Sequence, residues 1–570
     1  VRGAGSVVAG ANAIAGTVNL ITRRPSEDFF SLSSTLGVME NGALDPVATA
    51  NVGVVNDEAT AGVLLFGQVR QRQAYDRNGD ALSELPQLGT QSLGMSAFWQ
   101  PGKNTSLDLN AGLLSENRRG GSMDFQRAEH QSEAAESIAG NSIYYDLRFT
   151  QQLSAWQLTL FGGGMHTRRD NYYGAGFDAD AYGHTEEDNL NAGASFSRRA
   201  FDDRLLVLFG ADARYHDVID AYPGYDRLLE QAAWLAGGFL QANYALTDWL
   251  TIDVGMRADY HNLLERVVAN PRVGLSGQAG QWGYRVNYAQ GYRPPVAANE
   301  ALHMAMVGGE LRQVVLGDAL DAERSQSFTG GVTRSISWKG GQLLAKLDGF
   351  YTTLENTFVY EPLAGIDDGL TFEMRNGGDS RVTGATLELE LQQAWLNLRS
   401  GWTYQQTRLD EPAAWSDMLE GQDASTDEYL RTPDWYGYLV ATAQPTTALQ
   451  LTAEANFTGR MFAPHYGVPL EDAQAYLAEV PQSDYALETI TNGTIRTDAL
   501  NSTPIFAELG LHAAYTFELK GQLQLTLKAG GRNLLDSFQD DYDAGPLRDA
   551  GYIYGPHLPR MLYGGFSLSY

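Results

Sequence analysis

The chain has 570 residues, carries a formal net charge of −29 at pH 7 and contains no cysteine. This acidity argues against nucleic-acid binding, which requires a basic face. Aromatic residues make up 11% of the chain, whereas acidic disordered chains have few of them, so a folded protein is expected. The absence of cysteine suits a protein that crosses an oxidising periplasm.

The hydropathy pattern argues against membrane-spanning helices. No apolar run in the sequence approaches the ~18 residues that a transmembrane helix needs. A chain of this kind can span a membrane only as a closed β-barrel, because the lipid cannot satisfy free backbone hydrogen-bonding groups.

Apolar and polar residues alternate along many segments, among them residues 107–113, 252–260, 385–391 and 523–529. In the first segment, Leu107 and Leu109 lie on one face of the expected strand and Asp108 on the other. The polar faces carry charged residues as well as Ser and Thr. A wide transmembrane barrel turns such a face to a wet lumen and its apolar face to lipid. A soluble sandwich alternates too, but its polar face meets bulk water.

The connections between the expected strands alternate between short and long, with one exception near 261–266, where a short link replaces a long one. This alternation is typical of an outer-membrane barrel with periplasmic turns and extracellular loops, and the segments add up to about 22 antiparallel strands. The short connections lie at 101–104, 152–153, 245–248, 445–447 and 520–521. The long ones lie at roughly 70–91, 115–141, 165–186, 215–231, 291–322, 358–380, 409–432, 461–503 and 535–559.

The last segment, Met561–Tyr570, also alternates and ends the chain in the middle of a strand. A free sheet edge invites aggregation, whereas a strand that closes a barrel has no free edge. We therefore expect this segment to pair with the first strand, near Phe29–Gly37. In that arrangement Phe566 and Leu568 face lipid and Tyr570 lies at the periplasmic rim.

Five segments of the chain resemble motifs of the TonB-dependent outer-membrane receptors, in the order of that family. The N-terminal segment resembles the end of the family's plug domain, although Ala9 stands where the family usually has Tyr and Ala15 where it usually has Gly. The others resemble the family's Gly-Phe-Arg-Ala-Pro, Leu-Lys-Pro-Glu-Arg-Ser, Gly-Val-Glu-Leu-Glu and Asn-Leu-Phe-Asp motifs. The five segments are Gly5–Arg23, Gly291–Pro295, Leu320–Ser325, Arg381–Glu388 and Gly531–Asp536.

The resemblance implies two regions: residues 1–27 are expected to be the C-terminal end of a plug domain, and residues 28–570 the receptor barrel. It also implies a signal peptide, a TonB box and most of the plug upstream of Val1. The expected protein is a monomeric, cofactor-free importer in the outer membrane of a Gram-negative bacterium. Its expected partners are TonB, a metal-chelate substrate, the lipid bilayer and lipopolysaccharide.

The substrate class that we expect is a ferric siderophore or a similar metal chelate. Haem, cobalamin and a soft metal such as copper remain alternatives within the family, and a passive porin is the alternative from another class. No nucleophile–base pair suggests an enzyme.

Several side chains in the expected long connections are candidates for substrate contacts. In 165–186, arginines could hold an anionic chelate while tyrosines stack on its aromatic groups. In 291–322, a cluster of His and Met could bind a soft metal or an iron porphyrin. Ordinary loop packing, with Met filling gaps, is the alternative for each. The candidates are Arg168, Arg169, Tyr172, Tyr173, His184, Tyr292, Arg293, His303, Met304, Met306, His465 and Tyr466.

Overall fold

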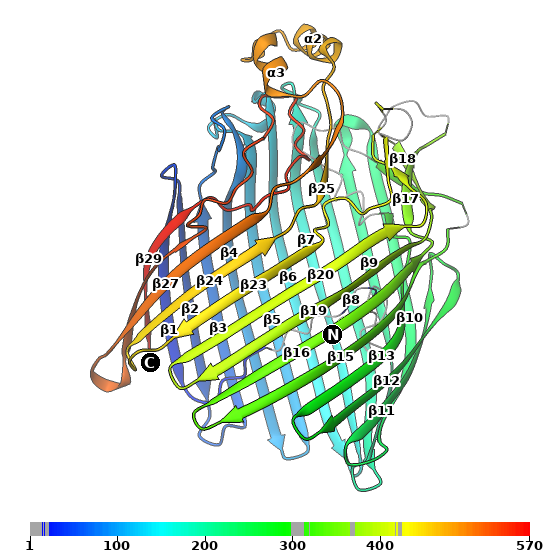
Figure 1. The fold of residues 1–570 in the computed structure, drawn as a ribbon, viewed down its shortest axis with the longest axis vertical. Coiled ribbons are helices and arrows are strands. Elements are labelled where there is room, and N and C mark those ends of the chain that lie inside the picture. Colours follow the sequence, from blue (N-terminus) through cyan, green and yellow to red (C-terminus); the bar gives the residue numbers. More distant parts are fainter. Residues whose placement is uncertain are drawn as a thin grey trace.

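Twenty-two antiparallel strands form one closed sheet in the computed structural model of the chain (Figure 1). The structure describes Ile14, Gly16 and residues 22–297, 313–318, 320–364, 371–416, 418–419 and 424–570. The closed sheet of 22 antiparallel strands confirms the predicted fold class and strand number. The barrel strands are β1 (Phe29–Met39), β2 (Leu44–Val55), β3 (Ala61–Arg72), β4 (Leu82–Gly102), β5 (Thr105–Ser122), β6 (Ala134–Leu153), β7 (Trp156–Ala175), β8 (Tyr182–Ala200), β9 (Leu205–Tyr222), β10 (Arg227–Ala245), β11 (Leu250–His261), β12 (Arg266–Ala279), β13 (Trp282–Arg293), β15 (Glu323–Trp338), β16 (Gly341–Glu355), β19 (Ser380–Gln393), β20 (Leu396–Leu409), β23 (Trp435–Ala443), β24 (Leu449–Thr458), β27 (Phe506–Glu518), β28 (Gln524–Arg532) and β29 (Met561–Ser569).

Smaller elements lie at the end of the barrel that carries the long connections, which we call the long-connection end (Figure 1). Strands β14, β18 and β17 form a three-stranded sheet in that order, and β21–β22 and β25–β26 form two small hairpins. Neither α-helix is long and apolar enough to cross a membrane, and no other helix of the described residues is. The bounds are β14 (Gln313–Leu316), β17 (Phe358–Pro362), β18 (Thr371–Asn376), β21 (Ala413–Ala414), β22 (Ser425–Thr426), β25 (Phe462–His465), β26 (Ala499–Ser502), α2 (Leu470–Glu479), α3 (Leu487–Gly493) and the 3₁₀ turns η1 (Glu129–Gln131), η2 (Pro223–Tyr225) and η4 (Lys520–Gln522).

The alternating pattern gives the barrel an apolar outside and a polar inside. On β11, Val254 and Met256 are 46% and 47% exposed on the outer face, whereas Arg257 and Asp259 are buried on the inner face. Successive side chains of a strand point to opposite faces of the sheet, so this contrast in burial follows directly from the sequence.

The first and last barrel strands pair and remove the free sheet edge, as predicted. Leu32 lies opposite Leu568 and Ser34 opposite Phe566. Backbone hydrogen bonds join Phe30 and Tyr570 in both directions, at 3.3 and 3.0 Å. Phe566 is 39% exposed on the outer face. Every barrel strand is thus paired on both sides, as a membrane-spanning sheet requires.

Four of the expected long connections are much shorter in the structure, so these predicted loops are wrong. The connection expected at 165–186 consists mostly of β7 and β8, and only residues 176–181 join them. Those expected at 70–91, 115–141 and 215–231 are likewise largely strand. β7 has 20 residues, whereas a bilayer crossing takes only about 9–11. Beyond the lipid both faces of a strand can be polar, so the alternation that marks a strand disappears while the pairing continues. The predicted short link is confirmed, because β11 ends at His261 and β12 begins at Arg266.

The expected plug remnant, residues 1–27, lies mainly outside the described residues, and its boundary at 27/28 stays a prediction. Of its last residues, Arg24 forms an ion pair with Asp108 on the inner face of β5. The guanidinium of Arg24 also lies 5.7 Å from the ring of Phe98. These contacts fix the chain to the barrel wall five residues before β1 begins.

Two introduced cysteines can test the closure between β1 and β29. Ser33 lies opposite Ser567, and the chain has no other cysteine. We expect Ser33→Cys with Ser567→Cys to form a disulfide, because directly opposed side chains approach within bonding reach. Gel electrophoresis of the boiled, non-reduced protein should show a circularised chain. Ser33→Cys with Ser569→Cys, shifted by two residues, is the control and should not cross-link; equal cross-linking of both pairs would contradict the register.

Candidate functional site

The inner wall of the barrel carries a polar patch where β7–β10 rise toward the long-connection end. The strand register places Arg169 opposite Thr185 and Thr185 opposite Asp220. One row further along, Tyr222 lies opposite Arg227. We call this set, completed by Asn171 and Tyr173, the inner patch. Side chains alternate between the two faces of each strand. Leu228 points outward and is 54% exposed, so its neighbour Arg227 and the other members of the patch, which share its register, face inward.

A chain of hydrogen bonds crosses the inner patch. Asn171 Nδ2 donates to Thr185 Oγ1 at 2.6 Å, and Thr185 Oγ1 donates to Asp220 Oδ1 at 2.7 Å. Asp220 Oδ2 lies 3.7 Å from Arg227 Nη2. Asn171, Thr185 and Asp220 are all buried. The carboxylate of Asp220 is therefore held in place by neighbours on two other strands, and it is the nearest anion to Arg227.

Arg227 is a buried cation with unused hydrogen-bond donors. Its side chain is 6% exposed, and Nε, Nη1 and Nη2 have no hydrogen-bond partner among the described residues. Its guanidinium carbon lies 5.4 Å from the ring of Tyr222, and that ring packs against Tyr173. An unsatisfied buried donor costs about 1–3 kcal/mol. A guanidinium presents a planar fork of donors, so Arg227 is suited to an anionic ligand.

A second polar group lies next to the inner patch, on the side toward the short turns. Arg169 Nη2 donates to Glu187 Oε2 at 2.7 Å, and His216 Nε2 lies 3.2 Å from Glu187 Oε1. Both His216 and Glu187 line an inward-facing cavity of about 530 Å³, together with Asp212, Arg214, Asn189, Asn191, His261, Pro294 and Val296. The wall of the lumen between the inner patch and the short turns is therefore polar and carries both positive and negative side chains.

The structure divides the predicted cluster at 165–186 between two faces of the barrel wall. Arg169 and Tyr173 face inward. Arg168 faces outward, where its side chain is 63% exposed and pairs with Glu186 at 2.7 Å. His184 also faces outward and lies 2.9 Å from Asp170. The residues separate because they belong to strands, in which neighbours alternate, and not to a loop that could gather them. Tyr172, on the outward register, is buried, and its hydroxyl donates to the backbone oxygen of Asp178 at 2.9 Å.

Tyr292 and Arg293, also predicted as ligand contacts, brace the link from β13 to β15. Tyr292 is buried in a cluster with Leu235, Val268 and Ala322. Arg293 Nε donates to Glu323 Oε2 at 2.5 Å, and its guanidinium lies 4.9 Å from the ring of Phe358. Glu323 also accepts a hydrogen bond from the Phe358 backbone at 2.7 Å. Both side chains thus contact the protein itself, and the buried Tyr292 hydroxyl has no hydrogen-bond partner among the described residues.

The predicted pair His465 and Tyr466 joins two long connections. His465 Nε2 lies 2.9 Å from Asp543 Oδ1, and its ring stacks on Tyr552 with centroids 3.7 Å apart. The backbone nitrogen of Tyr466 donates to Asp549 at 2.9 Å. Burial raises the pKa of Tyr552 to about 12, so its hydroxyl stays protonated. The other predicted contacts, His303, Met304 and Met306, lie outside the described residues.

A helical cap, which we define as residues 466–498 with α2 and α3, projects from the long-connection end (Figure 1). Glu133, just before β6, holds it there. The Glu133 carboxylate accepts hydrogen bonds from the Tyr476 hydroxyl at 2.9 Å, from the Ser483 hydroxyl and from the Asp484 backbone at 3.0 Å. Sequence reasoning did not identify Glu133, because its partners are more than 340 positions away.

One acidic cluster among the described residues has the spacing of a metal site: Asp76, Asp80 and Glu84. Its carboxylates are already engaged by the protein. Asp76 accepts hydrogen bonds from the backbone of Gly79 and Ala81, and Glu84 accepts one from the Arg77 backbone. These hydrogen bonds indicate that the cluster stabilises the turn between β3 and β4.

The members of the inner patch that sequence reasoning missed are Asn171, Thr185, Asp220, Tyr222 and Arg227. Only the register between strands could have identified these five residues, because they come from four different strands, each of which contributes one or two of them. Read singly, each is an ordinary polar residue near a turn.

The chain matches a family model described as "TonB dependent receptor-like, beta-barrel" over residues 55–560. No curated protein sequence matches it. Solved structures with similar folds include the siderophore receptor PirA from Pseudomonas aeruginosa, at 14% identity and a TM-score of 0.69, covering 100% of this chain and 86% of that one. The ferric enterobactin receptor PfeA from Pseudomonas aeruginosa is 16% identical with a TM-score of 0.74, and the match covers 100% of this chain and 84% of that one. The ferric-catecholate import receptor Fiu from K12 E. coli is 14% identical with a TM-score of 0.68, and the match covers 100% of this chain and 85% of that one.

Replacing Glu133 should release the cap. Glu133→Ala removes the acceptor of three hydrogen bonds, which we expect to cost about 1–3 kcal/mol locally. Hydrogen exchange of residues 470–493 should accelerate, while the melting temperature of the barrel stays unchanged. Glu479→Ala, at the exposed end of α2, is the matched control and should leave exchange unaltered. Equal exchange in both variants would show that Glu133 does not hold the cap.

Proposed function

This chain belongs to the family of TonB-dependent receptors, and from this premise we propose that it imports a ferric siderophore or a similar metal chelate across the outer membrane of a Gram-negative bacterium. In this proposal the barrel works as a monomer in the bilayer, and TonB supplies the energy. The protein acts as a transporter and carries out no chemistry on its substrate. The wide, closed barrel with an apolar outside and a polar inside supports this role.

The observation that carries the proposal is the buried guanidinium of Arg227. Its three nitrogen atoms have no hydrogen-bond partner among the described residues, and they lie on the inner wall near the long-connection end. Siderophores that bind iron through several deprotonated oxygens are anionic, so a ligand of this class would supply the missing acceptors. The names of the structural relatives, which are siderophore receptors, agree with this class.

The surroundings of Arg227 define how such a ligand would be held. Tyr222 packs beside the cation and, like it, is buried. Asp220, fixed by Thr185 at 2.7 Å, keeps the guanidinium in place and limits how many negative charges the site accepts. Arg169, one row away, is already paired with Glu187 at 2.7 Å. Recognition therefore rests on one buried cation whose nitrogen atoms have no hydrogen-bond partner among the described residues, with selectivity set by the nearby carboxylates.

Substituting Arg227 should weaken chelate binding without loss of the fold. For Arg227→Gln we expect a dissociation constant for a ferric catecholate that is at least about tenfold higher, because one charged contact is lost. Tryptophan fluorescence or calorimetry on the purified full-length receptor measures it. The inward Arg169→Ala should weaken binding less, and the outward Arg168→Ala should not change it. If Arg168→Ala weakened binding more than Arg227→Gln, the inner patch would not be the binding site.

Uptake by the complete receptor should depend on TonB and on the proton-motive force. Cells that carry the full reading frame should accumulate iron-55 from the chelate, and a protonophore or deletion of TonB should abolish the accumulation while surface binding persists. A passive pore would instead continue to take up the chelate after either treatment, and this result would contradict active import.

A further inference from the structure

Three sets of polar side chains on the inner wall join strands that are not neighbours. In each set, two partners come from strands on either side of a third strand, and a glycine of that middle strand lies between them in the same row. Neighbouring strands lie about 4.8 Å apart, so the backbones that carry the partners lie about 10 Å apart. We call the three arrangements the glycine clamps.

The first glycine clamp lies on β13, β15 and β16. The strand register places Arg285 opposite Gly331 and Gly331 opposite Asp348. Arg285 Nε donates to Asp348 Oδ1 at 3.1 Å, and Arg285 Nη2 donates to Asp348 Oδ2 at 2.6 Å. This is a bidentate ion pair. The neighbours Val286 and Leu347 point outward and are 61% and 55% exposed, so both partners of the ion pair face the lumen.

The second glycine clamp lies on β9, β10 and β11. Asp212 lies opposite Gly237, and Gly237 lies opposite Asp259. Arg257, also on β11, donates from Nη2 to Asp212 Oδ1 at 2.7 Å and from Nε to Asp259 Oδ2 at 3.0 Å. The three charged side chains are at most 5% exposed. This clamp therefore ties β9, which carries part of the inner patch, to β11.

The third glycine clamp lies on β27, β28 and β29. Tyr563 lies opposite Gly530, and Gly530 lies opposite His512. His512 Nδ1 lies 2.8 Å from the Tyr563 hydroxyl, and His512 Nε2 lies 3.0 Å from Glu454 Oε1 on β24. Because β24 pairs with β27, these contacts cross four consecutive strands of the ring, beside the strand pair that closes it.

The clamps require glycine because any side chain on the middle strand would occupy the space in which the partners meet. A Cβ atom added at Gly331 would lie 1.9 Å from Asp348 Oδ1, and one added at Gly237 would lie 1.9 Å from Asp259 Oδ1. Both distances are far below van der Waals contact. Neither glycine has a positive φ, so the requirement is for space and not for a special backbone conformation.

We propose that the glycine clamps stiffen the barrel wall and fix its curvature. The inner side of a closed barrel is concave, so side chains of second-neighbour strands converge there when the residue between them has no side chain. Flattening the wall would draw the partners apart and break their hydrogen bonds, and in two of the clamps these bonds join charged groups, which makes them strong. The clamps therefore resist deformation of the cross-section from the inside. This role is independent of the substrate that the lumen carries.

Adjacent glycines supply matched controls for a test. Gly330 and Gly238 are the outward neighbours of the clamp glycines, and a Cβ atom added to them would come no closer than 3.9 and 3.7 Å to any atom. We expect Gly331→Ala and Gly237→Ala to lower the temperature at which the purified chain loses its compact form on a heat-modifiability gel. Gly330→Ala and Gly238→Ala should leave this temperature unchanged. Equal effects of the inward and outward substitutions would overturn the proposal.

A double-mutant cycle separates the clamp from simple crowding. Asp348→Ala removes the atom that a Cβ at Gly331 would meet first. We expect Gly331→Ala to lower the unfolding temperature much less in the Asp348→Ala background than in the unmodified chain, because the clamp is already absent there. Fully additive effects would show that Gly331 does not act through the ion pair, and would overturn the proposal.

Hydrogen exchange measures the stiffness of the wall locally. Amides of β15 should exchange at least about tenfold faster in Gly331→Ala, because hydrogen bonds to charged groups are lost across this strand, and at the unmodified rate in Gly330→Ala. Asp348→Asn keeps the volume of the side chain and removes its charge, so it should also accelerate exchange in β15. This variant decides the matter if Gly331→Ala fails to fold: exchange as slow as in the unmodified chain would overturn the proposal.

Discussion

The hydrogen-bonded ring of strands is the constraint on which the rest of the structure depends. In lipid an unpaired backbone group costs several kcal/mol, so the sheet must close. The pairing of β1 with β29 closes it, and the pairings around the ring set the register of each strand against its neighbours. Because side chains alternate along each strand, this register also fixes which side chains face the lumen and which face the outside. The inner patch and the apolar outer face are two consequences of this register.

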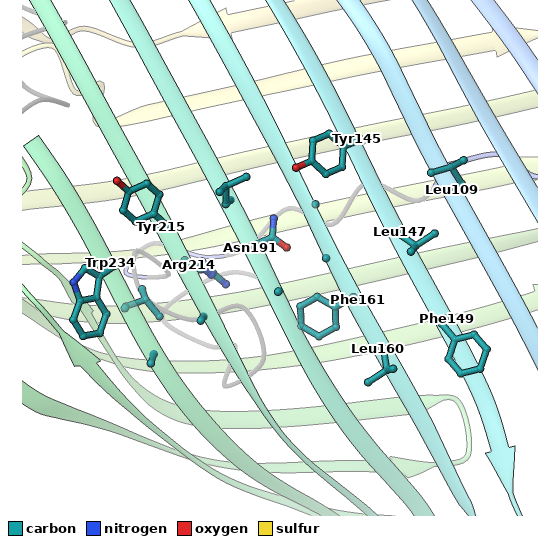
Figure 2. Close-up of a pocket in the computed structure, with 17 residues that line it drawn as sticks. Leu109, Tyr145, Leu147, Phe149, Leu160, Phe161, Asn191, Arg214, Tyr215 and Trp234 are labelled. Carbon is teal, nitrogen blue, oxygen red and sulfur yellow. The ribbon is translucent and has the colours of Figure 1, made fainter.

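The same wall, β7–β10, carries both surfaces back to back. On the inside, hydrogen bonds from Asn171 and Thr185 hold the carboxylate of Asp220, while Arg227 keeps its donors unused. On the outside, Gly162, Ala192 and Ala213 form a row of small residues in an apolar groove whose lining includes Tyr215 and Trp234 (Figure 2). A small residue on one face does not disturb the partner on the other, so the strands can meet two different demands.

Of the candidate residues, those in recognisable motifs turned out to be held by the protein. Arg293 pairs with Glu323 at 2.5 Å, and both belong to motifs that resemble the family's sequence signatures. His465, which stands in none of these motifs, likewise pairs with Asp543 and stacks on Tyr552. A motif can reflect a contact that joins a long connection to the barrel as readily as a contact with the ligand. Arg227, whose guanidinium nitrogens have no hydrogen-bond partner among the described residues, stands in no motif.

The sequence by itself determined the barrel, its closure and its strand number, because the two-residue period and the lengths of the connections are local properties of the chain. It did not reveal that most of 165–186 is strand, since beyond the lipid both faces can be polar and the alternation disappears. Only the tertiary structure decided that Arg169 faces inward while Arg168 faces outward, and that Arg227 meets Asp220 and Tyr222. The physical reason is that a sequence shows which residues share a face of one strand, whereas the register between strands shows which residues share a site.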